Sequence, residues 1–161
     1  MFVYSVKSST VKLFACILAA VTVAITLSFF TPTAAVQAVF ADNGKVVYTD
    51  AKDNDGRIKF LSQFGWQVDP TPVNETDVTV PTEFDTVFKG YNELQKHQGL
   101  DLSKYKRKSV TRYTYVVTNY EDYTGTVYAN LIIYRGRVIG GDICTEDSDG
   151  FIHGFSKSVT L

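Results

Sequence analysis

The stretch VIGGDICTEDSDGFIHGF, residues 138–155, holds the residues whose types could do chemistry. A carboxylate that orients an imidazole beside a thiol is the arrangement that a cysteine nucleophile needs. Asp142, His153 and Cys144 supply these three groups within a short span. A small cysteine/histidine-dependent enzyme is therefore one hypothesis, provided that the fold brings the three side chains onto one face.

The hairpin that contains these residues decides where their side chains lie. If TEDSDG is the loop, Cys144 lies opposite Phe151 and Asp142 opposite His153, so the trio shares the inner face of a sheet. A register slip of one residue would separate the three. The alternative is structural: Asp142 and His153 form a satisfied polar pair at one end of the core, and Cys144 is a small buried hydrophobe. Since no oxyanion donor or lid is evident, we favour this alternative and assign no catalytic residue.

The adjacent glycines at 140 and 141 have a structural explanation as well. Without side chains, Gly140 and Gly141 allow a helix, or an aromatic ring such as Trp66, to approach the sheet closely, or they form a bulge. We therefore interpret the stretch as a β-hairpin.

Four segments with alternating polarity predict the strands that position this hairpin: SVTRYTYVVTNY, TVYANLIIY, RVIGGDIC and FIHGF. Arg135-Gly136 suits a two-residue turn between the second and third. One register gathers the apolar residues on an inner face: Tyr113, Tyr115, Val117, Val127, Ala129, Leu131, Ile133, Val138 and Cys144. The outer face then carries Arg112, Thr114, Thr118, Asn130, Tyr134 and Arg137.

Two helices are predicted before the strands. DNDGRIKFLSQFGW begins at a candidate N-cap, Asp55, and ends at Gly65. VPTEFDTVFKGYNELQKHQG has a capping box of Thr82 and Asp85, ends at Gly99, and carries an apolar stripe that is typical of core. The predicted fold is α+β, with two helices packed on one face of a four-stranded antiparallel meander, preceded by an N-terminal transmembrane helix.

The apolar run LFACILAAVTVAITLSFF, residues 13–30, predicts the membrane helix, because it is just long enough to cross a bilayer. Lys7 and Lys12 precede it, which favours a cytoplasmic N-terminus and an extracytoplasmic remainder. The expected organisation is a cytoplasmic N-terminus (1–12), a membrane anchor (13–30), a tether (31–52) and an extracytoplasmic α+β domain (53–161). Signal peptidase sites ending at Ala38 and Ala41 leave open a cleaved, secreted form.

Charge and composition exclude several function classes. All 17 acidic residues and 14 of the 16 basic ones lie from Asp42 onward, which gives that part a net charge of −3. This balance argues against nucleic acid as a partner. DNDG and DSDG lack the carboxylate spacing of calcium loops, so no metal and no cofactor are predicted. The basic run Lys104–Lys108 could contact anionic lipid headgroups or acidic wall polymers, or it is a solvated loop.

Several blocks carry a resemblance: RIKFLSQFGW, VPTEFDTVFKGYNELQKHQGLDLSKY, RYTYVVTNY and ANLIIYRGRVIGGDIC with DGFIHGF. Over about residues 55–156 the chain resembles an uncharacterised domain family, a domain of unknown function found in membrane-anchored exported proteins of Gram-positive bacteria. The resemblance implies a cell-surface setting and implies no reaction.

Three functional hypotheses follow. We favour a membrane-tethered extracytoplasmic module that binds a protein or cell-envelope ligand without catalysis. Its membrane partner is the bilayer, contacted through residues 13–30, and its candidate ligand-binding residues are Tyr120, Tyr128, Tyr134 and Arg137. The alternatives are the cysteine/histidine enzyme and a structural accessory subunit of a membrane complex.

Overall fold

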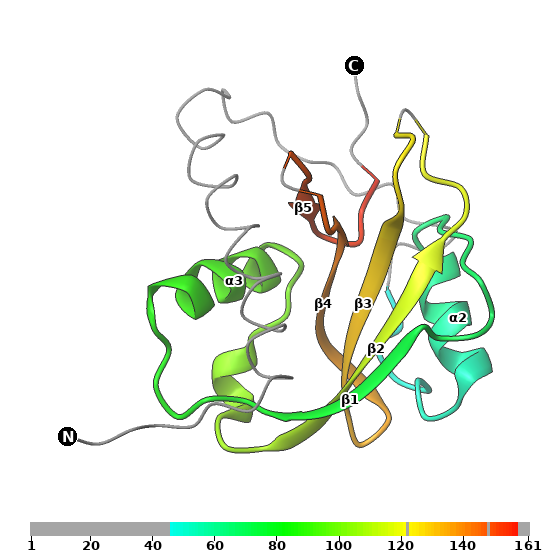
Figure 1. The fold of residues 1–161 in the computed structure, drawn as a ribbon. Helices are drawn as coiled ribbons and strands as arrows, with labels where there is room; N and C mark the ends of the chain where they lie inside the picture. Colours follow the sequence, from blue (N-terminus) through cyan, green and yellow to red (C-terminus); the bar gives the residue numbers. More distant parts are fainter. Residues whose placement is uncertain (1–45, 122, 148, 158–161) are drawn as a thin grey trace.

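A computed structural model of the chain describes residues 46–121, 123–147 and 149–157 (Figure 1). Its centre is a five-stranded sheet in the order β1-β2-β3-β4-β5, in which every neighbouring pair is antiparallel. The strands are β1 (Asn74–Thr79), β2 (Ser109–Val117), β3 (Val127–Tyr134), β4 (Arg137–Thr145) and β5 (Ile152–His153). The helices are α2 (Asn54–Ser62), α3 (Thr86–His97) and the short 3-10 helix η1 (Leu102–Tyr105).

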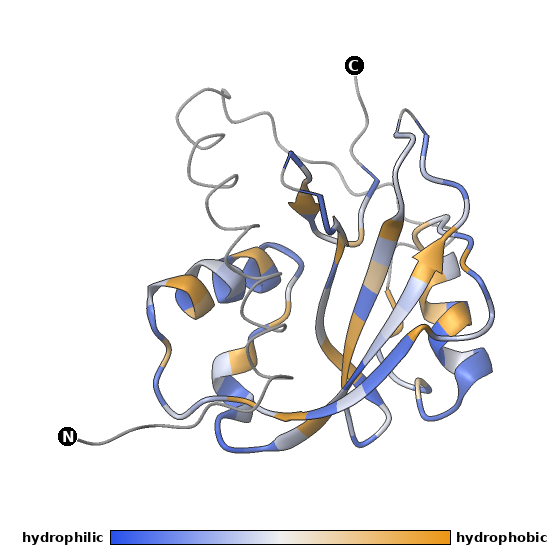
Figure 2. Ribbon diagram, in the orientation of Figure 1, coloured by the Kyte–Doolittle hydropathy of each residue, from blue (hydrophilic) through white to orange (hydrophobic). Residues whose placement is uncertain are grey.

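The antiparallel meander is confirmed, but the sheet has five strands rather than four. The additional strand, β1, pairs with β2 at one edge, and its segment lies between the two predicted helices, where the sequence predicts no strand. Its segment, NETDVT, contains one apolar residue and is largely hydrophilic in Figure 2. An edge strand with most side chains in solvent needs no alternating apolar pattern, so the usual sequence signal is weak.

The two helices cover opposite faces of the sheet, not one face as predicted (Figure 1). Phe60 and Leu61 of α2 pack in a core with β2, β3 and β4, and that core contains every predicted inner-face residue except Cys144. Tyr91 of α3 packs in a second core with Val110 and Ile139. We call these the α2 face and the α3 face.

The N-caps of the two helices lie two and three residues away from the predicted ones. Asp53, not Asp55, caps α2, and its side chain accepts a hydrogen bond from Gly56 N. Asp85 caps α3 and accepts from Phe88 N, so the aspartate of the predicted capping box is itself the N-cap. Gly99 follows α3 with φ 76°, the conformation expected of a C-terminal glycine.

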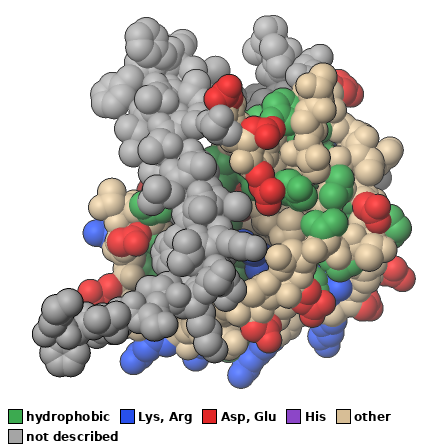
Figure 3. Space-filling view, viewed as in Figure 1, with side chains coloured by type: hydrophobic (Ala, Val, Ile, Leu, Met, Phe, Trp, Pro, Cys, Tyr) green, Lys and Arg blue, Asp and Glu red, His purple; other side chains and the backbone are tan. Residues whose placement is uncertain are grey.

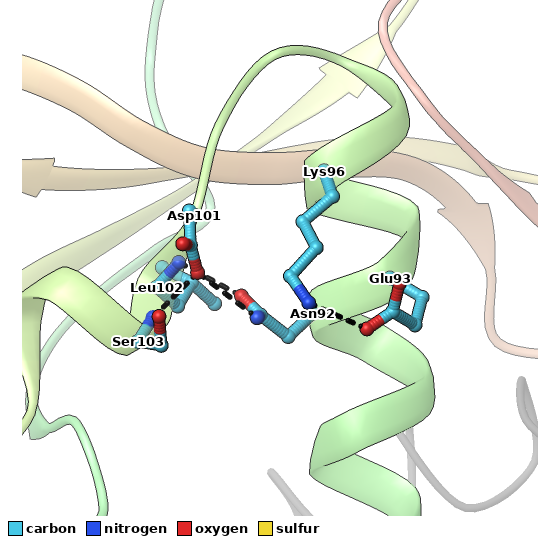
Figure 4. A network of polar contacts seen from close by, with 6 residues as sticks. All are labelled: Asn92, Glu93, Lys96, Asp101, Leu102 and Ser103. Carbon is cyan, nitrogen blue, oxygen red and sulfur yellow. Dashed lines mark hydrogen bonds and ion pairs between the residues drawn. The ribbon is translucent and has the colours of Figure 1, made fainter.

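A polar network attaches η1 to α3 (Figure 4). Asn92 Nδ2 donates to Asp101 Oδ1 over 3.1 Å, and Leu102 N donates to Asn92 Oδ1 over 2.8 Å. Asp101 also accepts from Ser103 N, and the side-chain hydrogen bond of Ser103, followed by that of Asn92, lowers the pKa of Asp101 to about 2. The network fixes the start of η1, and with it the basic segment that follows.

A bulge in β4 sets the orientation of the chemically interesting residues. Ile133 pairs with Val138 as predicted, but Ile132 pairs with Gly140, so Ile139 is the extra residue. From there on, each β4 residue is displaced by one position against β3. The predicted turn at Arg135-Gly136 is confirmed, and both residues have the positive φ that a type I′ turn requires.

The two glycines explain why the bulge fits. A Cβ on Gly140 would lie 3.0 Å from Leu102 Cδ2 and 3.3 Å from Gln95 Oε1, on the α3 face. A Cβ on Gly141 would overlap Asn130 O and the ring of Phe155, on the other side of the strand. The close aromatic neighbour is therefore Phe155 rather than Trp66.

Within the described residues, no helix is long and apolar enough to span a bilayer. The predicted anchor, residues 13–30, and the first part of the predicted tether lie outside them.

Candidate functional site

The structure does not bring the predicted trio together. Asp142 pairs with Asn130 and Cys144 with Tyr128, which places both side chains on the α3 face. His153 pairs with Ile143 of the α2-face core instead of Asp142. The β4–β5 register differs from the predicted one by one residue, which places His153 on the α2 face. The bulge, one of the explanations that the sequence offers for Gly140 and Gly141, places Asp142 and Cys144 on the α3 face, so β4 separates the imidazole from the thiol.

Asp142 is the centre of a buried polar cluster, and its side chain is only 4% exposed. Tyr91 Oη of α3 donates to its Oδ1 over 2.7 Å, and Asn130 Nδ2 of β3 donates to its Oδ2 over 2.9 Å. Thr114 Oγ1 of β2 in turn donates to Asn130 Oδ1 over 2.8 Å. Helix α3 and strand β3 therefore contact the carboxyl group of β4 directly, and β2 joins the cluster through Asn130.

Cys144 lies at the edge of the same cluster. Asn130 Nδ2 lies 3.2 Å from its sulfur, and the side chain is 8% exposed. Its thiol also hydrogen-bonds the Asp142 carboxyl group. The thiol is thus held by polar neighbours on the α3 face, without an imidazole among them.

The environment of the cluster opposes ionisation of the Asp142 carboxyl group. Burial raises the pKa of Asp142, and the hydrogen bonds from Tyr91 and Asn130 and the charge of Arg112 oppose that rise only in part. Burial, followed by the charge of Asp142, raises the pKa of the Tyr91 phenol well above its usual value. Tyr91 is therefore a permanent donor at neutral pH.

Two buried donors near this face have no hydrogen-bond partner among the described residues: Arg112 Nε and Gln95 Nε2. The other polar atom of the Gln95 side chain, Oε1, does have a partner: it accepts a hydrogen bond from Gly141 N over 2.8 Å. The same glycine's carbonyl accepts from Gln98 Nε2. Helix α3 is thus bound to β4 by amide side chains as well as by Tyr91.

His153 belongs to a separate aromatic cluster at the end of the α2 face. Its Nδ1 lies 2.6 Å from Gly154 O, and its Nε2 lies 3.2 Å from Tyr120 Oη. Because a carbonyl only accepts, Nδ1 carries the proton of the neutral ring and Nε2 accepts from the tyrosine. Burial lowers the pKa of His153, so the ring is neutral at pH 7.

Stacked rings continue this cluster through two loops. Tyr120 stacks on Trp66 with ring centroids 5.5 Å apart, and on Phe151 at 4.8 Å. Phe151 also stacks on His153 at 5.5 Å and meets the edge of Tyr123 at 5.4 Å. Trp66 is buried, whereas the other four are half-buried. We call Tyr120, Tyr123, Phe151 and His153 the aromatic loop cluster.

The four predicted ligand-binding residues do not form one surface. Tyr120 lies in the aromatic loop cluster on the α2 face. Tyr128 lies beside Cys144 on the α3 face. Tyr134 and Arg137 lie at the opposite end of the β3–β4 hairpin, where Tyr134 meets the ring of Tyr105 and Arg137 lies over that of Tyr48.

Sequence reasoning missed the partners that give Asp142 its environment. Tyr91 belongs by its spacing to the apolar stripe of the second predicted helix, and Thr114 and Asn130 belong to the predicted outer face of the sheet. The available signal was the alternation of polar with apolar residues, such as Ile132, on that outer side. Among the described residues, no cluster of His, Cys, Asp or Glu has the composition of a metal site.

Comparison with known protein families gives a match. A family model described as a domain of unknown function (DUF4830) matches residues 60–143, which run from α2 through most of β4. No curated protein and no solved structure matches the chain.

Proposed function

Because the chain belongs to the DUF4830 family, whose function is unknown, we propose a function from its own residues: a membrane-tethered extracytoplasmic module that binds a protein or cell-envelope ligand without catalysis. The setting we propose is the outer side of the membrane of a Gram-positive bacterium. The uncharged apolar run at 13–30 and the basic residues before it support the tether. The folded residues from Val46 onward support a domain on the far side of it.

The aromatic loop cluster is the observation that carries the binding proposal. Its side chains come from the β2–β3 loop, the β4–β5 loop and β5, and they are half-buried rather than enclosed. Aromatic side chains in loops on a rigid sheet are a common source of binding energy at interfaces. The same loops carry exposed acids, Glu121, Glu146, Asp147 and Asp149, which favour a ligand with basic groups at its rim.

The separation of His153 from Cys144 favours binding over catalysis. A cysteine nucleophile that is activated by an imidazole needs that ring within hydrogen-bond reach, and β4 lies between Cys144 and His153. His153 instead accepts from Tyr120 and donates to a backbone carbonyl, which uses both ring nitrogens in packing.

Site-specific photocrosslinking in the producing cell tests the proposal. A photoreactive residue at Thr124, which is exposed in the β2–β3 loop, should give a discrete adduct with one envelope component. The matched control is Lys59, exposed on α2, where no adduct is expected. Tyr120→Ala with Phe151→Ala should abolish the Thr124 adduct without releasing the protein from the membrane.

Three results would contradict the proposal. Equal adducts at the two positions, or none at Thr124, would favour a structural accessory subunit. Release of the chain from membranes by alkaline washing would show that residues 13–30 do not anchor it in the bilayer. A turnover activity lost in Cys144→Ser would favour the enzyme.

A further inference from the structure

One end of the domain is lined by basic side chains, and we call it the basic end. It combines the segment after η1 with the β3–β4 turn and the residues that precede α2. Its members, all exposed, are Lys52, Lys104, Lys106, Arg107, Lys108, Arg135 and Arg137. In Figure 3, Lys and Arg side chains line the lower edge of the molecule, where β3 turns into β4 in Figure 1.

Direct contacts hold these separate segments together. The ring of Tyr105, in η1, lies 5.5 Å from that of Tyr134 at the end of β3. Ala51 N donates to Gly136 O over 3.0 Å, which brings the neighbouring Lys52 onto the β3–β4 turn. These contacts fix the three segments of the basic end relative to one another.

The segment after η1 is anchored on its other side as well. Val80 N donates to Lys108 O over 3.0 Å, and Arg107 N donates to Val80 O over 2.8 Å. The carboxylates nearest in sequence are Asp50, Asp53, Glu83 and Asp101, so the seven basic side chains of the basic end still leave an excess of positive charge.

The opposite end of the sheet has the opposite charge. The loops beyond β2 and β4 carry the exposed acids Glu121, Glu146, Asp147 and Asp149, beside the aromatic loop cluster. An electric field that attracts one end of the domain therefore repels the other.

The proposed tether limits the distance between the domain and the bilayer. Residues 31–45 separate the predicted anchor from Val46, and such a segment reaches at most about 50 Å when extended and about 20 Å as a flexible coil. Over that span the domain meets the membrane surface at high effective concentration. Weak electrostatic contacts are then sufficient to select one orientation, since each Lys or Arg near an anionic surface contributes attraction.

We propose that the basic end lies against anionic lipid headgroups of the membrane that holds residues 13–30, so that the acidic end and its aromatic loop cluster face outward. This inference rests on the proposed function for the tether, and it adds the lipid partner and the orientation. It also assigns different roles to residues that the sequence had grouped: Arg137 to the membrane side, and Tyr120 to the ligand side.

Hydrogen exchange of the full chain in proteoliposomes tests the inference. The vesicles contain phosphatidylcholine alone, or phosphatidylcholine mixed with phosphatidylglycerol. On the anionic vesicles, amides of residues 104–108 and 135–137 should exchange about tenfold more slowly than on neutral ones, and high salt should remove the difference. Amides of the aromatic loop cluster should exchange equally on both.

Charge variants supply the matched control. Lys104→Glu with Lys108→Glu reverses two exposed charges at the basic end and should abolish the protection. Lys59→Glu with Lys157→Glu makes the same change in net charge away from that end, and should leave the protection intact.

The outcomes separate this inference from the proposed function. Retention of the chain after alkaline washing, with identical exchange on both kinds of vesicle, overturns the orientation alone. Loss of the chain on washing overturns the tether, and this inference with it. If soluble polyphosphate added to neutral vesicles protects the same amides while anionic lipid does not, the partner is a polyanionic polymer and the lipid assignment is wrong.

Discussion

Tyr91 Oη donates a 2.7 Å hydrogen bond to Asp142 Oδ1, and this contact joins α3 to the middle of β4. Both residues are buried, with exposures of 8% and 4%. Asn130 completes the coordination of the carboxyl group from β3. The α3 face therefore has a polar centre within a largely apolar core, and its energy depends on satisfied donors.

The first prediction concerns this centre. Asp142→Ala should lower the free energy of unfolding by about 1–3 kcal/mol, because the Tyr91 hydroxyl and the Asn130 amide lose their shared acceptor. With Tyr91→Phe, the double variant should lose less than the sum of the two single changes. Urea unfolding of a chain that begins at residue 46, monitored by the fluorescence of Trp66, measures the stability loss and the coupling.

Glu146→Ala is the control, since Glu146 is an exposed carboxylate on the hairpin that follows β4. Its effect should stay within about 0.5 kcal/mol. Strict additivity of the Asp142 and Tyr91 changes would contradict the coupling.

The second prediction is a pH dependence centred on His153. Burial lowers the pKa of the folded-state ring below its usual 6.5, so the unfolded chain binds a proton more readily. The stability due to the neutral ring is fully present above pH 6.5, and is lost as the pH falls through the folded-state pKa. The advantage of the native chain over His153→Gln should therefore shrink between pH 7.5 and pH 5, as measured by urea unfolding at each pH.

Asp142 provides an internal contrast, because its titration acts in the opposite direction. Its folded-state pKa is raised, so its contribution to stability is present below its usual pKa of 3.8 and is lost as the pH rises through the folded value.

A stability difference between the native chain and His153→Gln that stays constant with pH would show that the His153 ring is not buried as described.

The bulge in β4 explains why the sheet was predictable and the site was not. Alternation along β2 and β3 identifies the α2 face, and Tyr115, Ala129 and Leu131 are all buried there. The bulge depends instead on Leu102 and Gln95 on one side of β4 and Phe155 on the other, all distant in sequence. The paired glycines permit a bulge but do not fix its position, so strict alternation puts Asp142 on the wrong face.

The position of α3 was missed for a related reason. Its apolar stripe correctly indicates a buried side, but any apolar face of the sheet could receive it. Val110, Ile132 and Ile139 supply a second apolar patch on the outer side, interspersed with Arg112 and Thr114. Mixed polarity of this kind resembles a solvated face unless the buried hydrogen bonds are known.

The third prediction compares the two glycines of the bulge. Gly141→Ala should destabilise the domain more than Gly140→Ala, because its Cβ would overlap the backbone oxygen of Asn130 and a ring. The Cβ at 140 meets the far end of the Leu102 side chain, which can move by a few tenths of an ångström. We expect about 2–4 kcal/mol at position 141 and about 1 kcal/mol at 140, by urea unfolding. Equal costs would argue against the bulge at Ile139.

The last prediction concerns the thiol. In a chain that begins at residue 46, Cys144 is the only cysteine. At 8% exposure it should react with a thiol reagent about tenfold more slowly, or slower still, than in the unfolded chain. The nucleophilic thiolate needs water or a cationic partner. The Asn130 amide and the Asp142 carboxyl group lie beside the sulfur, and an ionised carboxylate there would oppose a second negative charge. Cys144→Ser with Ser103→Cys moves the thiol to an exposed position on η1 and should react rapidly in the native state. Rapid labelling of native Cys144 would instead mean that the α3 face opens to solvent or that the thiol is activated. That result would favour the cysteine/histidine enzyme over the non-catalytic binding module.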